Sequence, residues 1–362
     1  MFEAKTVLVL GAGASVEVGL PVGSQLLDDI CKLIDIKFDF SSQKSGDRTI
    51  FDALKIVVNE DREVVKTNEH LHCAWQILKS AEQGLSIDNI VDALEDERIE
   101  LIAKLGIVRA IQMAEEKSQC FSKPLDHNKE LELSHFKSSW YDSLTKAICE
   151  KRRVSDISKV FENLSIISFN YDRCIERYLP FSIANYYGVS SQTILDLMPR
   201  LKIVRPYGIA GLLPWMPNPI SKYNSDHRIH AAQLANSAEM IRTFTQGVAD
   251  ETVSAEIRSV ISDAERIIFL GFAFHPQNME ILTAKVDQST QVLATAHSAS
   301  ENDRRVIQDS ILNTFGYRGD RPSSIFIAPE TCSELFRSYW RTITAPPLAK
   351  SIRYHLSKEA IG

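Results

Sequence analysis

The chain of 362 residues lacks the short patterns that mark several common classes of protein. Its six cysteines are scattered singly and none forms a Cys-x-x-Cys pair, which argues against a zinc ribbon. Their spread is typical of reduced thiols, at positions 31, 73, 120, 149, 174 and 332. No apolar run approaches the roughly 18 residues that a membrane span needs.

An excess of positive charge is missing too, and a net charge of −6 at pH 7 gives no general affinity for nucleic acid. The first five residues contain neither a basic nor an apolar segment, so we expect no signal peptide and a cytoplasmic protein. The sequence also has no P-loop, no nucleophile elbow and no His-Glu-x-x-His pattern. We therefore expect no membrane association, no direct nucleic-acid binding and no metal.

Short apolar segments alternate with helical segments over most of the chain. The segments typical of strands are residues 6–10, 164–169, 203–204, 266–270, 291–295 and 324–328. Residues 6–10 are a continuous apolar run, which is typical of a parallel strand buried on both faces. Alternation of such strands with helices favours an α/β fold with a Rossmann-like, doubly wound parallel sheet flanked by helices.

Between residues 50 and 163 the apolar residues recur at helical spacing, as they do in Ile87, Ile90 and Leu94. We therefore expect a helical insertion at 50–163 and a Rossmann-like domain made of residues 1–49 and 164–362. The local pattern further predicts a short strand within 34–40, a polar loop over 41–48 and one helix over 231–260.

The first strand ends in a glycine-rich turn that is followed by a helix. Glycines at positions 11 and 13 let the backbone approach a pyrophosphate closely, and the N–H groups at a helix start attract its negative charge. The dinucleotide fingerprint Gly-x-Gly-x-x-Gly requires a third glycine at position 16, where this chain has Val16. The loop therefore predicts a diphosphate site, or else a tight turn without a ligand, and it departs from the usual dehydrogenase pattern.

Four segments of the chain resemble motifs of sirtuins and sirtuin-like proteins, which use NAD as a substrate. The segment Gly11-Ala-Gly-Ala-Ser15 with Gly19-Leu-Pro21 resembles the first motif, and Ser168-Phe-Asn-Tyr-Asp172 resembles the Thr-x-Asn-Tyr-Asp motif. Arg205-Pro-Tyr-Gly208 stands where the family has a His-Gly pair, and Leu270-Gly-Phe-Ala-Phe274 resembles the segment over the nicotinamide ribose. Ser86-Ile-Asp88 resembles a segment common in bacterial members that lack a zinc module.

The resemblance implies that NAD binds as a substrate and is hydrolysed to nicotinamide and ADP-ribose, as in many bacterial sirtuin-like domains that act in antiphage defence. The motifs and their neighbours assign cofactor binding to Gly11, Ala12, Gly13, Ala14, Ser15, Pro21, Asn170, Asp172, Gly208, Gly271, Phe272 and Asn278. Such an enzyme must be held inactive until a signal arrives. We therefore expect an activating or sensor protein partner, or a change of oligomeric state, as the switch.

Hydrolysis of this bond needs a group that orients the ribose or the water, and an asparagine at a strand end suits this role. Asn170 is therefore the first catalytic candidate, with Asp172 as a cap of the following helix. Position 207 is a histidine base in the family and is Tyr207 here, a poor base because a phenol has a reference pKa of about 10. Either Tyr207 serves a site that needs no base, or His275 is the base, or the site binds NAD or ADP-ribose without turnover.

The sequence leaves four alternative functions, which we rank from the most to the least favoured. They are an NAD glycohydrolase, a sensor module that binds NAD or ADP-ribose, an NAD-dependent protein deacylase and a hydride-transferring dehydrogenase. The missing zinc ribbon and histidine place the deacylase third, and Val16 places the dehydrogenase last. The leading hypothesis requires that the amides of Gly11–Ser15 lie beside Asn170 in the folded chain.

Overall fold

The computed structural model describes residues 2–40, 42–58, 64–121, 131–216, 227–244, 246, 250–317 and 324–346. Within them six strands form one parallel sheet in the order β5-β4-β1-β6-β7-β8. They are β1 (Thr6–Leu10), β4 (Leu164–Ser168), β5 (Lys202–Val204), β6 (Arg266–Leu270), β7 (Gln291–Thr295) and β8 (Ile325–Ala328). This is the strand order of a Rossmann fold, in which the order reverses between β1 and β6. The predicted Rossmann-like α/β fold is confirmed.

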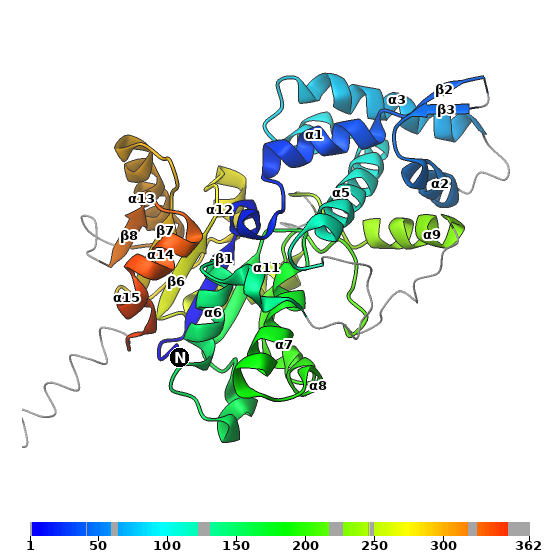
Figure 1. Ribbon diagram of the computed structural model, residues 1–362. Helices are drawn as coiled ribbons and strands as arrows, with labels where there is room; N and C mark the ends of the chain where they lie inside the picture. The colour runs from blue at the N-terminus through cyan, green and yellow to red at the C-terminus, as the bar shows by residue number, and fades with distance from the viewer. Residues whose placement is uncertain are drawn as a thin grey trace, which may run out of the picture.

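Helices cover both faces of this sheet (Figure 1). Alternate residues of β1 point to opposite faces, so Val7 and Val9 belong to one apolar core and Leu8 and Leu10 to the other. The first core includes α11 (Glu251–Ser262), α12 (Pro276–Ile281) and α13 (Glu301–Phe315). The second includes α6 (Trp140–Cys149), α7 (Cys174–Tyr187), α14 (Cys332–Ser338) and α15 (Trp340–Thr344). Burial on both faces explains why the middle residues of the strands are apolar.

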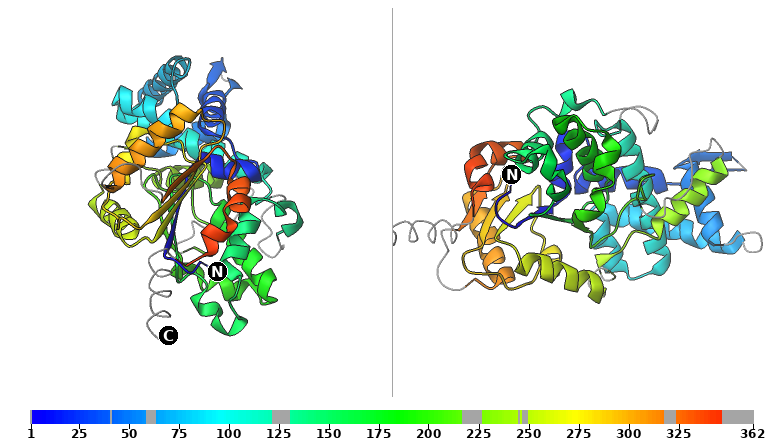
Figure 2. Two further views of the ribbon diagram at one scale, coloured as in Figure 1. Left: turned by 90° about the vertical axis from the view of Figure 1, so that its left-hand side faces the viewer. Right: turned by 90° about the horizontal axis from the view of Figure 1, so that it is seen from below.

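A group of helices packs beyond the carboxyl ends of the strands, and we call it the helical group (Figures 1 and 2). It consists of α1 (Gly23–Ile34), α2 (Arg48–Val57), α3 (Val64–Ala81), α4 (Ile87–Leu94), α5 (Glu97–Lys117) and α9 (His227–Ala238). Two of these, α1 and α9, lie outside residues 50–163, whereas α6 lies inside that range and packs against α7 and α14. The division of the chain into domains at residues 50 and 163 stays a prediction.

Two short strands form a separate antiparallel hairpin, β2 (Lys37–Asp39) with β3 (Ser42–Ser45). The strand predicted within 34–40 is confirmed by β2, but the loop predicted over 41–48 is wrong because β3 occupies part of it. The sequence of β3 is Ser-Gln-Lys-Ser, which has no apolar residue and therefore none of the alternation that identifies a strand. The remaining short helices are η1 (Ala12–Val18), η2 (Leu133–Phe136), η3 (Val154–Lys159), α8 (Ser191–Leu195) and η4 (Met198–Arg200).

The single helix predicted over 231–260 is wrong, because α9 and α11 are separate helices. Between them Ile241 forms an isolated antiparallel bridge with Gly208. The backbone N–H of Arg242 also donates to the carbonyl oxygen of Tyr207 at 3.0 Å. Tyr207 and Gly208, after β5, therefore pair with the backbone of Ile241 and Arg242. In a continuous helix the backbone of these two residues would bond within the helix instead.

Candidate functional site

The loop after β1 packs directly against the end of β6. The backbone N–H groups of Gly11 and Gly13 donate to the carbonyl oxygens of Leu270 and Gly271, each at 3.0 Å. A Cβ on Gly11 would lie 2.6 Å from the Gly271 oxygen, and one on Gly13 would lie 2.8 Å from the Gly271 Cα. Contact between two strand ends therefore requires both glycines, and both amides already have partners within the protein.

The loop continues into η1, where the amides differ in what they contact. The N–H of Ala14 donates to the carbonyl oxygen of Gly11 at 2.9 Å. Ala12 is exposed, and the structure shows no acceptor for its N–H among the described residues. Of the N–H groups of residues 11–14, that of Ala12 is therefore the one without an acceptor among the described residues.

Asn170 follows β4, and its side chain reaches the glycine loop. Its Nδ2 donates to the carbonyl oxygen of Gly11 at 3.0 Å and to Ser15 Oγ at 3.1 Å. Because a carbonyl oxygen only accepts, the contact with Gly11 identifies which amide atom is the nitrogen. The Oδ1 atom has no donor among the described residues, although the residue is only 8% exposed. The structure thus places Asn170 beside the glycine loop and leaves its oxygen available as an acceptor.

Ser15 and Asp172 complete this polar network. Ser15 Oγ donates to Asp172 Oδ2 at 2.7 Å, and Asp172 Oδ1 accepts from the backbone N–H of Cys174 at 3.0 Å. The second contact caps the start of α7, as the sequence predicts for Asp172. Both side chains are buried, so this network is shielded from water.

Arg205, at the end of β5, holds the backbone of Asn170. One terminal nitrogen of Arg205 donates to the Asn170 carbonyl oxygen at 2.6 Å, and the guanidinium forms a 2.6 Å ion pair with Glu176. This role is not predicted from the sequence, where Arg205 stands out only as the first residue of a four-residue motif. The available signal was an arginine directly after a strand, but nothing in the sequence indicates Glu176 as its partner.

Tyr207 lies in a cluster of aromatic rings beside this polar network. Its ring contacts those of Phe169 and Tyr171, and Phe272 packs on Phe169 with 5.1 Å between the ring centroids. The Tyr207 hydroxyl donates to Asn278 Oδ1 at 2.5 Å. Burial raises the pKa of Tyr207, so the phenol stays neutral near pH 7 and acts as a donor. The structure brings Tyr207, Asn278 and Phe272 together and argues against Tyr207 as a base.

Helix α4 of the helical group closes one side of this edge. The hydroxyl of Tyr171 donates to Asp88 Oδ1 at 2.6 Å, and Asn89 Nδ2 donates to Gln277 Oε1 at 3.2 Å. Burial raises the pKa of Asp88. These contacts join α4 to the residues after β4 and to α12. Asp88 thus contacts a residue of the Asn-Tyr-Asp motif, a contact that the sequence does not indicate.

Gly208 and Gly271 are both required by the backbone. Their φ angles are 78° and 55°, in the left-handed region that favours glycine. A Cβ on Gly208 would lie 1.8 Å from the Met240 oxygen, and one on Gly271 would lie 2.0 Å from the Ala14 nitrogen. These contacts explain both glycines structurally, and a role of either in cofactor binding stays a prediction.

Pro21 and His275 have no side-chain hydrogen bond to the residues above among those that the structure describes. Pro21 lines a cavity of about 630 Å³ between α1 and α5, together with Asp28 and Met113. His275 is exposed and forms the N-cap of α12. The structure shows no contact of its ring with Asn170 or with Tyr207, so it does not bring this candidate base to the network.

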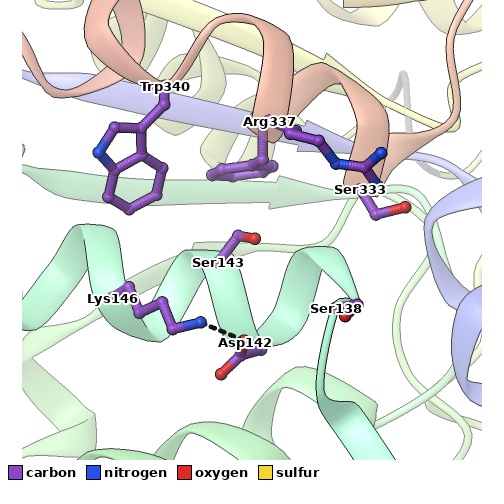
Figure 3. A pocket seen from close by; sticks show the side chains of 8 residues that line it. Ser138, Asp142, Ser143, Lys146, Ser333, Arg337 and Trp340 are labelled. Atoms are coloured by element: carbon purple, nitrogen blue, oxygen red, sulfur yellow. Dashed lines mark hydrogen bonds and ion pairs between the residues drawn. The ribbon is translucent and has the colours of Figure 1, made fainter.

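Another cavity, of about 430 Å³, lies between α6 and the pair α14 and α15 (Figure 3). An ion pair of Lys146 with Asp142 at 2.6 Å forms part of its α6 wall, and Trp340 and Arg337 stand on the opposite wall. None of the predicted site residues lines this cavity. Asn170 lines neither cavity.

No protein-family model matches the chain, and no curated protein matches it either. Within the described ranges, no three His, Cys, Asp or Glu side chains gather so that they could hold a metal ion. In the same part of the chain, no helix has the length and apolar character needed to cross a membrane. The fold and the site define the class as a Rossmann-like α/β protein with a buried polar network at the carboxyl edge of its sheet.

Proposed function

We propose that this protein binds NAD at the carboxyl edge of the sheet and hydrolyses it to nicotinamide and ADP-ribose. The observation that carries the proposal is the position of Asn170. Its Nδ2 is held by Gly11 and Ser15, its Oδ1 has no donor among the described residues, and the Gly11 loop packs on the end of β6, where the strand order reverses. Ligands of open α/β sheets bind at this reversal point.

The proposed reaction needs little from the protein beyond placement and charge. The C–N bond between the ribose and the cationic pyridinium breaks, a C–O bond to water forms, and nicotinamide and one proton leave. Asn170 Oδ1 accepts a hydrogen bond from a ribose hydroxyl or from the attacking water, and its amide cannot rotate without losing two contacts. Arg205 keeps the Asn170 backbone in place.

The burial of this network supports the further proposal that the enzyme is held inactive. Asn170 is 8% exposed, and the amides of Gly11 and Gly13 are bonded to the end of β6. Entry of a substrate therefore requires a local rearrangement, which a protein partner or a change of oligomeric state can supply. A role in antiphage defence follows from the resemblance to bacterial sirtuin-like domains and belongs to this proposal.

A second candidate function is a sensor that binds NAD or ADP-ribose without turnover. The observation that favours it is Tyr207, which stands in place of the family histidine and donates a hydrogen bond to Asn278 Oδ1. In such a sensor Asn170 Oδ1 accepts a hydrogen bond from the ligand, and Tyr207 is a donor instead of the family's histidine base.

The test combines calorimetry with chromatographic detection of nicotinamide, using the full chain alone and with the product of the neighbouring gene. We expect NAD to bind to the wild type, and nicotinamide release to fall at least about 100-fold in Asn170→Ala. Asn163→Ala is the matched control, because Asn163 bonds to the Phe2 carbonyl oxygen at the other end of β4. Absence of NAD binding contradicts both candidates, and binding without release in every condition favours the sensor.

A further inference from the structure

The hairpin formed by β2 and β3 has strand edges that pair with no other strand in the described part of the chain. It lies at the outer end of the helical group (Figures 1 and 2). All three residues of β2 are exposed, and Phe40, directly after this strand, is fully exposed. A two-stranded ribbon is marginally stable by itself, and an open strand edge is a template for a further strand.

Of the two strands, β2 has the more regular edge. Lys37 pairs with Ser45 and Phe38 pairs with Gln43, so Lys44 is an extra residue on β3. Such a bulge increases the local twist of the strand that carries it and disfavours further pairing at its edge. The three residues of β2 pair without an extra residue among them. An added strand therefore finds a regular edge on β2.

The backbone of Phe38 points away from β3. Asp39 pairs with Ser42, only three positions later in the chain, and the residues that close such a tight hairpin exchange hydrogen bonds with each other. Hydrogen-bonded and non-bonded pairs alternate along an antiparallel ladder, so Phe38 and Gln43 form a non-bonded pair. The N–H and C=O of Phe38 are therefore directed to the open edge, where no backbone group of the described residues contacts them.

The sequence of β2, Lys37-Phe38-Asp39, is complementary to itself in the antiparallel orientation. In an antiparallel pair centred on Phe38, Lys37 of each copy stands opposite Asp39 of the other, so two opposite-charge pairs form. In a parallel pair in register, lysine faces lysine and aspartate faces aspartate, which is unfavourable. The sequence of β3 is Ser-Gln-Lys-Ser, which has a lysine but no acidic residue and therefore lacks this complementarity.

We infer that β2 is the contact surface for a second copy of this chain, and that two hairpins join there into a four-stranded antiparallel sheet. A two-fold axis passes between the two Phe38 residues, which exchange backbone hydrogen bonds. In one chain the ring of Phe38 packs on that of Phe51 of α2, with 4.8 Å between the ring centroids. Directly opposite residues share a face of the sheet, so the two Phe38 rings lie beside each other on this face.

The ion pairs inside each hairpin do not oppose this assembly. Lys37 Nζ lies 2.9 Å from Asp35 Oδ2, and Lys44 Nζ lies 3.7 Å from Asp39 Oδ2. All four side chains are 30% exposed or more, and ion pairs this exposed contribute little to stability. In the dimer Lys37 gains a second carboxylate and Asp39 gains a second cation. Because only three residues of each copy lie on the shared edge, we expect a weak dimer that forms at about 100 μM.

Sedimentation velocity of the full chain between about 5 and 500 μM measures the assembly. We expect the weight-average mass of the wild type to rise with concentration toward that of a dimer. Lys37→Asp and Asp39→Lys each replace both opposite-charge pairs by like-charge pairs, and each weakens the dimer at least about tenfold. Lys159→Asp makes the same change of charge at an exposed position of η3 and is the matched control, with the assembly of the wild type.

A mixture of the two single variants separates the proposed pairing from a general effect of charge. When Lys37→Asp meets Asp39→Lys, the aspartates of one strand face the lysines of the other at both positions. The mixture therefore assembles like the wild type although neither variant does so alone, and the variant with both substitutions regains assembly as well. A wild type that stays monomeric up to about 500 μM, a dimer that neither single variant weakens, or a mixture that stays monomeric overturns the inference.

Discussion

The side-chain amide of Asn170 donates to the backbone carbonyl oxygen of Gly11 at 3.0 Å, joining the ends of β4 and β1. The two residues are 159 positions apart in the chain and meet because β4 and β1 are neighbours in the sheet. The same nitrogen also contacts Ser15 Oγ, which is bonded to Asp172. A negative charge introduced at Asn170 would therefore lie close to the carboxylate of Asp172.

Asn170→Asp is expected to destabilise the protein by about 1–3 kcal/mol. The carboxylate cannot donate to Gly11, so it leaves a buried carbonyl oxygen unpaired and adds a charge close to Asp172. Urea unfolding at pH 7 measures the change, with Asn163→Asp at the opposite end of β4 as the comparison. Equal stability of wild type and Asn170→Asp contradicts the assigned orientation of the amide.

The parallel sheet could be anticipated because most of its strands contain a short apolar run between helical segments. Strands β1 and β6 are buried on both faces, and that burial is visible in the sequence as the apolar runs 7–10 and 267–270. The hairpin strand β3 could not be anticipated, since Ser-Gln-Lys-Ser has no apolar periodicity. The break between α9 and α11 depends on pairing of Ile241 with Gly208, a contact between residues distant in sequence.

In the candidate site, too, some contacts could be predicted from the sequence and others could not. The contact of Asn170 with the glycine loop follows from strand ends meeting at one edge of a parallel sheet, which the motif order already indicates. The partners Arg205–Glu176 and Tyr171–Asp88 are side-chain contacts across different elements, and no local pattern specifies them. His275 shows the converse, because a position close to a motif in sequence did not place its ring in the network.

Gly271→Ala is expected to destabilise the fold by about 3 kcal/mol or more. The added Cβ would lie 2.0 Å from the Ala14 nitrogen, and the φ of 55° is itself unfavourable for alanine. Gly23→Ala is the matched control, because a Cβ there meets no atom within 4 Å at the start of α1. Calorimetric unfolding of both variants measures the difference in their stability. A Gly271→Ala protein as stable as Gly23→Ala would show that the two strand ends do not pack as described.

Asp88→Asn is expected to raise the free energy of unfolding at pH 7. Burial raises the pKa of Asp88 in the folded protein, so the ionised carboxylate opposes folding at pH values above that pKa. As the pH falls, the folded protein takes up a proton before the unfolded chain does, and wild-type stability increases relative to the variant. The two stabilities therefore converge as the pH approaches about 4, the reference value for an unperturbed aspartate. Tyr171 keeps an acceptor in the variant, since the asparagine oxygen can replace Oδ1.

Urea unfolding of wild type and Asp88→Asn across this pH range tests the prediction. Asp39→Asn, at an exposed position of the hairpin, is the control and is expected to change the stability by less than about 0.5 kcal/mol. A difference between wild type and Asp88→Asn that stays constant with pH would contradict the burial of an ionisable carboxyl group against Tyr171.

Tyr207→Phe is expected to lower NAD turnover by only about fivefold, which corresponds to the loss of one neutral hydrogen bond to Asn278. Removal of a general base, by contrast, lowers the rate by about 100-fold or more. Tyr187→Phe is the control, because that hydroxyl bonds to backbone carbonyl oxygens far from the site. Rates of nicotinamide release decide between the two roles, and a loss near 100-fold in Tyr207→Phe would assign the phenol a part in proton transfer.

Glu17→Gln is expected to destabilise the protein by about 1 kcal/mol. The two carboxylate oxygens of Glu17, on η1, accept from the backbone N–H groups of Trp140 and Ser333 at 2.9 Å each, so one side chain caps both α6 and α14. Glutamine keeps one acceptor oxygen and places an NH₂ group against the other N–H, which breaks one cap and removes the negative charge from both helix starts. Urea unfolding measures the loss, with Glu162→Gln, an exposed position, as the control. Because η1 continues directly from the glycine loop, the variant should also weaken NAD binding in calorimetry, whereas unchanged stability and unchanged binding would show that Glu17 does not hold this loop in position.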